Sequence, residues 1–123
     1  MIKILIVEDE RILAVTTSMH LEKAGYYVMG IVDSGEEAVE YALRETPDII
    51  LMDIILQGKI SGIDAVKRIS AESKAKIIYT TAHTDTATVE AANKTRNSGF
   101  LSKPYSRNEL LNVLNTAISS EAV

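Results

Sequence analysis

The sequence predicts an α/β protein built on one doubly wound parallel sheet of five strands, in a flavodoxin-like arrangement. Short runs of large apolar residues recur along the chain without polar alternation, which is typical of strands buried on both faces. Stretches with apolar residues at helical spacing separate these runs, and regular alternation of strand and helix indicates parallel pairing. The clearest strand is residues 49–53, where four apolar residues follow Pro47-Asp48 and lead to Asp53.

Five strands are expected in all, each of them followed by a helix. They cover residues 2–7, 27–32, 49–53, 75–80 and 99–102. Right-handed crossover connections leave few ways to order such strands in one sheet. The flavodoxin-like order 2-1-3-4-5 places the first and third strands side by side, and ligands of such sheets bind there, beyond the carboxyl ends of the strands.

The first two helices are predicted from apolar spacing and from their end residues. The first helix ends at Gly25, a residue suited to the position just after a helix. The second helix opens at Ser34 and Glu37, which have the spacing of a capping box, and Pro47 ends it. The residues expected to face the core are Leu13, Thr17, Leu21 and Ala24 in the first helix, and Val39, Ala42 and Leu43 in the second.

A loop is expected over residues 54–61, with Gly58 and Gly62 as its backbone hinges. The fourth helix, over about residues 85–95, carries few apolar residues and should be the element held least firmly. Ser106 and Glu109 form a second capping-box spacing at the start of the last helix. The inner residues expected in the third and last helices are Ile63, Val66, Ile69, Leu110, Val113, Leu114, Ala117 and Ile118.

Length and composition restrict the classes of protein. A chain of 123 residues predicts one domain over residues 1–123, with no output domain beside it. The formal net charge of -4 argues against direct nucleic-acid binding. Cysteine is absent, acidic residues come too early for a signal peptide, and no apolar run reaches the length of a membrane span. We therefore expect a cytoplasmic protein with no membrane contact.

Polar side chains leave four of the strands at one edge of the predicted sheet. Glu8 and Asp9 follow the first strand and Asp53 ends the third, while the fourth leads into Thr81 and the fifth into Lys103. Carboxylates crowded into one crevice raise one another's pKa unless a cation lies among them. Carboxylate oxygens with room for water suit Mg²⁺, so the sequence predicts a magnesium site at this edge.

A metal and a lysine that neutralise charge, together with an Asp nucleophile, describe a site for phosphoryl transfer to a carboxylate. Asp53 is the expected nucleophile because it stands alone on the central strand, whereas Glu8 and Asp9 are adjacent and suit the metal. Each motif also has a plainer explanation, since acids favour a helix N-terminus and a Lys-Pro or Thr-Thr pair suits a turn. Their coincidence at one edge favours the functional interpretation.

With these residues in these places, the chain resembles the receiver domain of two-component response regulators over nearly its whole length. The motifs that carry the resemblance are Glu8-Asp9, Asp53, Thr81-Ala82 and Lys103-Pro104. The resemblance implies that Asp53 accepts a phosphoryl group from a histidine kinase or phosphotransfer protein, with Thr81 and Lys103 assisting. It implies that Mg²⁺ is held by Glu8, Asp9, Asp53 and the backbone carbonyl of Ile55. Such a domain catalyses only its own phosphorylation and dephosphorylation, and is otherwise not an enzyme.

The resemblance also implies a switch. Phosphorylation draws Thr81 toward the phosphoryl group and lets Phe100 turn inward, as a shift between two existing populations. The surface of the fourth helix, last strand and last helix then changes, which would affect a downstream effector or a phosphorylation-dependent dimer. The loop after Asp53 departs from the commonest pattern, because it lacks a proline and reaches Gly62 one residue late.

Other classes fit the sequence less well. A flavodoxin cofactor site needs a phosphate-binding loop after the first strand, where this chain has acids. A phosphatase similar to the haloacid dehalogenases needs Asp-x-Asp at that place, and Glu8-Asp9-Glu10 does not supply it. The remaining alternative is a degenerate receiver that acts as a phosphorylation-independent docking module.

Overall fold

The computed structural model describes residues 1–82 and 85–119, and it contains one five-stranded sheet. The strands are β1 (Lys3–Val7), β2 (Tyr27–Val32), β3 (Ile49–Asp53), β4 (Lys76–Thr81) and β5 (Gly99–Ser102). The helices are α1 (Arg11–Lys23), α2 (Gly35–Glu45), α3 (Gly62–Ser70), α4 (Thr86–Asn93) and α5 (Arg107–Ser119). All strand pairs are parallel and the order is β2-β1-β3-β4-β5, which confirms the predicted topology.

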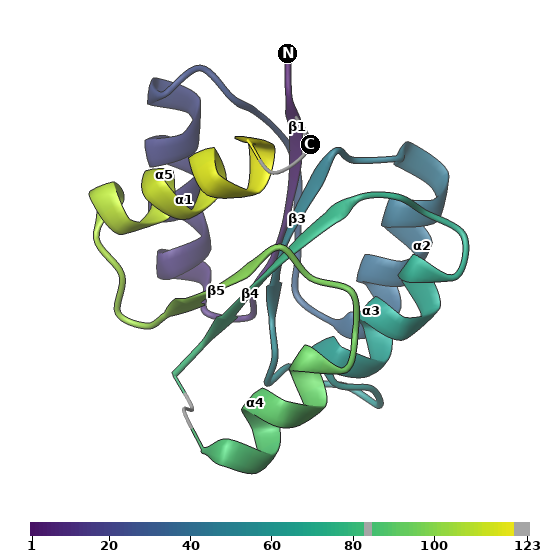
Figure 1. Cartoon of the computed structure of the whole chain (residues 1–123). Helices are drawn as coiled ribbons and strands as arrows, with labels where there is room; N and C mark the ends of the chain where they lie inside the picture. Colours follow the sequence, from purple (N-terminus) through teal and green to yellow (C-terminus); the bar gives the residue numbers. More distant parts are fainter. Residues whose placement is uncertain (83–84, 120–123) are drawn as a thin grey trace.

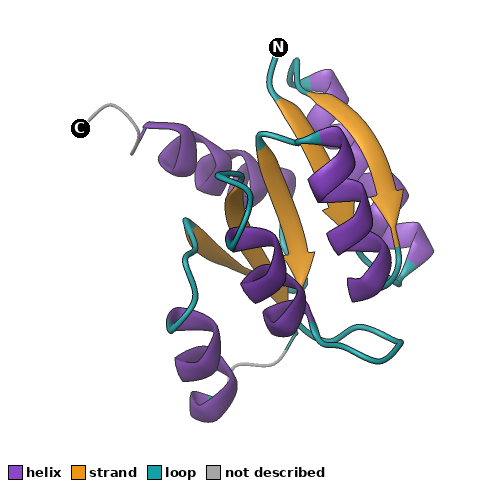
Figure 2. Ribbon diagram, turned by 90° about the vertical axis from the view of Figure 1, so that its right-hand side faces the viewer, coloured by secondary structure: helices purple, strands orange, loops and turns teal. Residues whose placement is uncertain are grey.

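Helices cover both faces of the sheet (Figure 1, Figure 2). α1 and α5 pack on one face, while α2, α3 and α4 contribute to the core on the other. The central strand β3 is buried at every position, and its residues alternate between the two cores. Ile50 and Met52 join the core with α2 and α3, whereas Ile49 and Leu51 join the core with α1 and α5. Burial on both sides explains the unbroken apolar run of this strand.

Two of the predicted helix starts carry serine caps. In the last helix the Glu109 amide donates to Ser106 Oγ at 3.1 Å, and the Ser106 amide donates to the Glu109 carboxylate at 2.9 Å, so this capping box is complete. At α2 the Glu37 amide donates to Ser34 Oγ at 3.2 Å, but the Glu37 carboxylate accepts the Ser34 hydroxyl instead of the backbone amide. The second half of that predicted box is therefore missing.

Some residues expected to face the core do not. Leu43 is 36% exposed, and Ala24 lies beyond the end of α1 and is also exposed. The fully buried positions of α2 are the small residues Gly35, Ala38 and Ala42, because this helix packs closely against β1 and α3. Of the three predicted inner residues of α2, Ala42 is buried and Val39 packs against the core, so only Leu43 was placed wrongly. Among the described residues, no helix has the length and apolarity needed to cross a membrane.

The two glycines of the loop after β3 have different roles. Gly58 has a φ of 108°, a left-handed conformation that glycine adopts without strain, as a hinge requires. Gly62 is instead the first residue of α3, so its predicted hinge role is wrong. A Cβ atom at Gly62 would lie 2.0 Å from the carbonyl oxygen of Asp53, so glycine is needed there for close backbone approach. The start of α3 thereby packs directly against the backbone at the end of β3.

Candidate functional site

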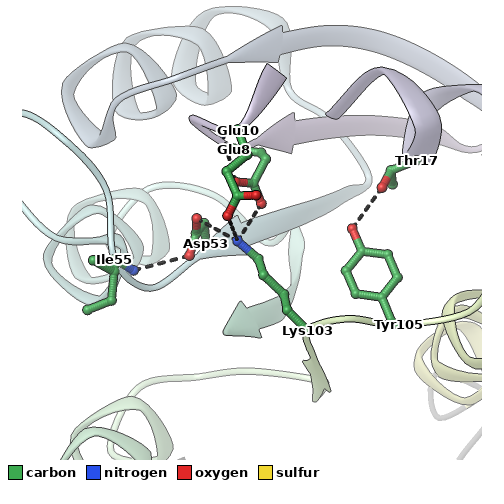
Figure 3. A network of polar contacts seen from close by, with 7 residues as sticks. All are labelled: Glu8, Glu10, Thr17, Asp53, Ile55, Lys103 and Tyr105. Carbon is green, nitrogen blue, oxygen red and sulfur yellow. Dashed lines mark hydrogen bonds and ion pairs between the residues drawn. The ribbon is translucent and has the colours of Figure 1, made fainter. Parts of the chain in front are cut away.

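Three side chains from three different strand ends meet at the carboxyl edge of the sheet (Figure 3). The Lys103 ammonium donates to Asp53 Oδ2 at 2.9 Å and lies 2.7 Å from Glu8 Oε1. The more exposed Glu10 is at the edge of ion-pair distance, 3.9 Å from Lys103 Nζ. The side chains of Lys103, Glu8 and Asp53 are 9%, 4% and 5% exposed, so this is a nearly buried charge cluster.

The sheet register explains why these residues meet. Val7 pairs with Met52, so the residues that follow, Glu8 and Asp53, leave neighbouring strands at the same level. Lys103 directly follows β5, which is separated from β3 by β4, and its amide donates to the Thr81 carbonyl at 2.8 Å. That bond fixes the lysine backbone at the sheet edge, and the long side chain then reaches across β4 to the carboxylates.

Each buried carboxylate also binds the backbone. Asp53 Oδ1 accepts the Ile55 amide at 3.2 Å, and Glu8 Oε2 accepts the Glu10 amide at 3.0 Å. Both side chains therefore use one oxygen for Lys103 and the other for the loop that follows their own strand. Because both oxygens have partners, the two carboxylates are held in fixed orientations.

Asp9 completes the acidic cluster. Glu8, Asp9 and Asp53 each offer one carboxylate oxygen, and these oxygens lie within 4.8 Å of one another. Three oxygen donors in that volume, beside a cleft of about 340 Å³, match the few protein ligands plus water that Mg²⁺ requires. Asp53, Asp9, Ile55 and Lys103 are among the residues that line this cleft. A larger cavity of about 570 Å³ lies around Pro47 and Lys74 and includes none of the predicted site residues.

The charges of the site are unevenly balanced. Burial raises the pKa of Glu8 to about 7, and the nearby Asp53 charge adds to this, although hydrogen bonds from Lys103 and the Glu10 amide oppose it. Burial alone would lower the pKa of Lys103, but its hydrogen bonds to Glu8 and Asp53 outweigh burial and raise it. One ammonium faces three carboxylates, so a divalent cation would neutralise the remaining charge.

The predicted switch residues lie on the next two strands. Thr81 is the last residue of β4 and is 3% exposed. Phe100 lies on β5 opposite Tyr79 of β4, with the two ring centroids 5.4 Å apart, and it packs against the core on the α2–α3 side. Thr81 and Tyr79 are two residues apart on one strand, so their side chains point to the same face of the sheet.

Two contacts near the site were not predicted. Tyr105 and the buried Thr17 of α1 share a hydrogen bond of 2.7 Å between their hydroxyl oxygens, which ties the segment after Lys103 to α1 (Figure 3). The Glu36 carboxylate of α2 accepts the amides of Lys59 and Ile60, each at 3.3 Å, and so holds the loop after β3. The only sign of the Tyr105 contact in the sequence was that Thr17 is a polar residue at an inner position of α1. Nothing in the sequence indicated the contact of Glu36 with the loop.

Comparison with known proteins identifies the family of this chain. The family model for the response regulator receiver domain matches residues 4–115, a range that contains the candidate site residues from Glu8 to Lys103. The transcriptional regulatory protein PdtaR of Mycobacterium tuberculosis is 32% identical over 117 residues, which are 95% of this chain and 57% of PdtaR. The chemotaxis protein CheY of Thermotoga maritima is 36% identical over 92% of this chain and 94% of its own length. The chain thus spans little more than half the length of PdtaR.

Solved structures give the same result. The signal receiver domain of a modulated diguanylate cyclase from Desulfovibrio desulfuricans is 38% identical, with a TM-score of 0.90 over 98% of this chain and 95% of that one. The receiver domain of the sensor histidine kinase PA1611 from Pseudomonas aeruginosa, described with a magnesium ion in its active-site cleft, is 32% identical, with a TM-score of 0.85 over 95% and 97% of the two chains. The chain belongs to the family of response regulator receiver domains.

Proposed function

We propose that this receiver domain is an active phosphoacceptor, in which Asp53 takes a phosphoryl group from a histidine kinase or phosphotransfer protein. The observation that carries the proposal is the contact of Asp53 with Lys103, beside two further acidic residues, at the mouth of an open cleft. A degenerate docking module would not need this buried set of charges, which costs desolvation free energy to assemble.

The chemistry assigns one role to each side chain. A carboxylate oxygen of Asp53 attacks the phosphorus atom of a phosphohistidine, an oxygen–phosphorus bond forms, and the nitrogen–phosphorus bond breaks. The imidazole leaves with the electron pair and takes up a proton. Lys103 is close enough to Asp53 for its ammonium to follow the new negative charge onto a phosphoryl oxygen. The Thr81 hydroxyl is proposed to donate to another phosphoryl oxygen.

The acidic residues are proposed to hold Mg²⁺. Glu8, Asp9 and Asp53 supply carboxylate oxygens, and the Ile55 carbonyl, on the loop tied to Asp53, is the proposed fourth protein ligand. The metal, when bound, neutralises charge on the transferring phosphoryl group. The magnesium described in the PA1611 receiver supports this proposal.

Signalling is proposed to follow from Thr81 and Phe100. Movement of Thr81 toward the phosphoryl group and of Phe100 inward would change the α4-β5-α5 surface, which would bind a downstream effector or a second copy of the chain. With a net charge of -4, the chain is proposed to act in the cytoplasm without direct contact to nucleic acid or membrane.

Intact mass after incubation with Mg²⁺ and acetyl phosphate tests the phosphoacceptor role. We expect the mass to rise by one phosphoryl group, and this gain should disappear without Mg²⁺ and in the Asp53→Asn variant. The matched control is Asp48→Asn, which removes an exposed carboxylate at the other end of β3 and should leave the mass gain intact. A gain that persists in Asp53→Asn would refute Asp53 as the acceptor. No gain, together with no Mg²⁺ binding in a titration, would favour the docking module.

A further inference from the structure

α4 is held to the sheet by little apolar contact. Ala92 is its one buried residue, and Val89 is half-buried. α4 stands apart from the other helices in the second view of the fold (Figure 2). A helix with so little buried surface depends on specific contacts for its position.

One such contact reaches its C-terminal end from the centre of the sheet. Tyr79 is fully buried on β4, and its hydroxyl oxygen lies 2.6 Å from the Oγ1 atom of Thr95, two residues beyond α4. Thr95 Oγ1 donates its own hydrogen to the carbonyl of Ala92. Since a hydroxyl has one hydrogen, Tyr79 must be the donor to Thr95. Two consecutive hydrogen bonds therefore link Tyr79 to Thr95 and Thr95 to the last turn of α4.

The same phenol also contacts the predicted switch aromatic. The rings of Tyr79 and Phe100 are tilted by 33° with centroids 5.4 Å apart, and the two residues are paired across β4 and β5. Among the described residues, Tyr79 is the aromatic side chain that joins Phe100, through its ring, to the end of α4, through its hydroxyl. Because side chains in protein interiors are closely packed, a movement of the Phe100 ring is expected to displace the Tyr79 ring beside it.

We propose that Tyr79 is a positioning residue that couples the packing of Phe100 to the position of α4. The inference rests on the proposed function for its role in signalling, because that function makes Phe100 the moving residue. When the Phe100 ring moves, the Tyr79 ring that packs on it shifts, and the donor hydroxyl moves the C-terminal end of α4 through Thr95. The hydroxyl thus converts a change in the core into a change on the α4-β5-α5 surface.

Tyr79→Phe removes this donor and keeps the ring. The matched control is Tyr41→Phe, since the Tyr41 hydroxyl donates to the Met29 carbonyl between α2 and β2, at the opposite edge of the sheet. Hydrogen exchange at the amides of Lys94 and Thr95, which bond within the last turn of α4, should become about fivefold faster in Tyr79→Phe. It should stay unchanged in Tyr41→Phe.

A double-mutant cycle tests the coupling itself, without any phosphoryl group. Phe100→Leu changes the ring packing on Tyr79, and we expect it to alter exchange at Lys94 and Thr95 when Tyr79 is present but much less in Tyr79→Phe. A merely structural tyrosine would give additive effects, and additivity would overturn the proposal. A non-additive cycle supports it.

The last measurement separates this inference from the proposed function. Mg²⁺ with beryllofluoride, a phosphoryl analogue, is added to each variant, and the NMR signals of Phe100 and of α4 are followed. In Tyr79→Phe we expect the Phe100 signals to respond while the α4 response is lost; an intact α4 response would overturn the coupling. If neither Phe100 nor α4 responds to beryllofluoride in the unmodified protein, the proposed switch is refuted. A non-additive double-mutant cycle would in that case still support the coupling through Tyr79.

Discussion

The proposed role of Glu8 as a magnesium ligand predicts that Mg²⁺ binding depends on pH near neutrality, because burial raises the pKa of Glu8. Metal ligands must be deprotonated, so Mg²⁺ competes with the proton that Glu8 binds with a pKa of about 7. Glu8 is about nine-tenths ionised at pH 8 and about one-tenth ionised at pH 6. We therefore expect the Kd for Mg²⁺ to rise about tenfold when the pH falls from 8 to 6.

Calorimetric titration with MgCl₂ at fixed ionic strength measures this change, and Glu8→Gln provides the control. The variant has no carboxyl to titrate at this position, so its Mg²⁺ affinity should be weaker throughout and nearly constant across the range. A Kd that changes less than about twofold in the unmodified protein would refute the reasoning, since it would mean that Glu8 is ionised at both pH values or does not bind the metal.

The free energy of unfolding of the metal-free protein should fall as the pH rises, whereas the affinity for Mg²⁺ should increase. Glu8 is easier to ionise in the unfolded chain, where its pKa is 4.5, than in the folded one, where it is about 7. The contribution of protonated Glu8 to the free energy of unfolding is complete below pH 4.5 and is lost as the pH rises through about 7. The full difference is on the order of 3 kcal/mol, and urea unfolding without Mg²⁺ should reveal a loss of this sign.

Two predictions concern the loop after β3. Gly62→Ala should lower the free energy of unfolding by about 2 kcal/mol or more, because the added Cβ would lie 2.0 Å from the Asp53 carbonyl oxygen. Urea unfolding measures this loss, and an unchanged midpoint would contradict it. Glu36→Gln should speed hydrogen exchange at the backbone amides of Lys59 and Ile60, whereas the control Glu40→Gln should leave it unchanged. Equal exchange rates in the two variants would show that the Glu36 carboxylate does not hold the loop. Hydrogen bonds led by the Lys59 amide lower the pKa of Glu36, so this contact should persist at neutral pH and be lost below pH 4.5.

The sheet and the gathering of charged residues could be predicted because both depend on simple rules. Buried strands read as apolar runs, and the carboxyl ends of parallel strands share one edge of the sheet, so Glu8, Asp53 and Lys103 had to come near one another. The sequence predicts that Lys103 neutralises charge at this edge, but it does not specify which group the lysine contacts. In the structure it contacts both buried acids, since their desolvated charges need a partner.

The contacts between distant hydroxyl groups could not be predicted. Thr17 and Tyr105 are 88 residues apart, and Tyr79 and Thr95 are 16 apart, and no periodic pattern specifies which hydroxyl groups will meet. The role of Gly62 was missed for a related reason. A glycine in a loop suggests a hinge, but its use here follows from the backbone that passes beside it, which is known only once β3 and α3 are packed.

The sequence positions of the charged residues determine when, during synthesis, the buried charge cluster can form. Glu8 and Asp53 emerge from the ribosome early, and Lys103 follows 50 residues after Asp53. A nascent chain that stops before Lys103 presents acidic groups without the ammonium that balances them, even when it already contains the residues of β5. The cleft therefore cannot form as a local motif on a partial chain. A ligand that contacts both Asp53 and Lys103 can thus bind only after β5 has joined the sheet.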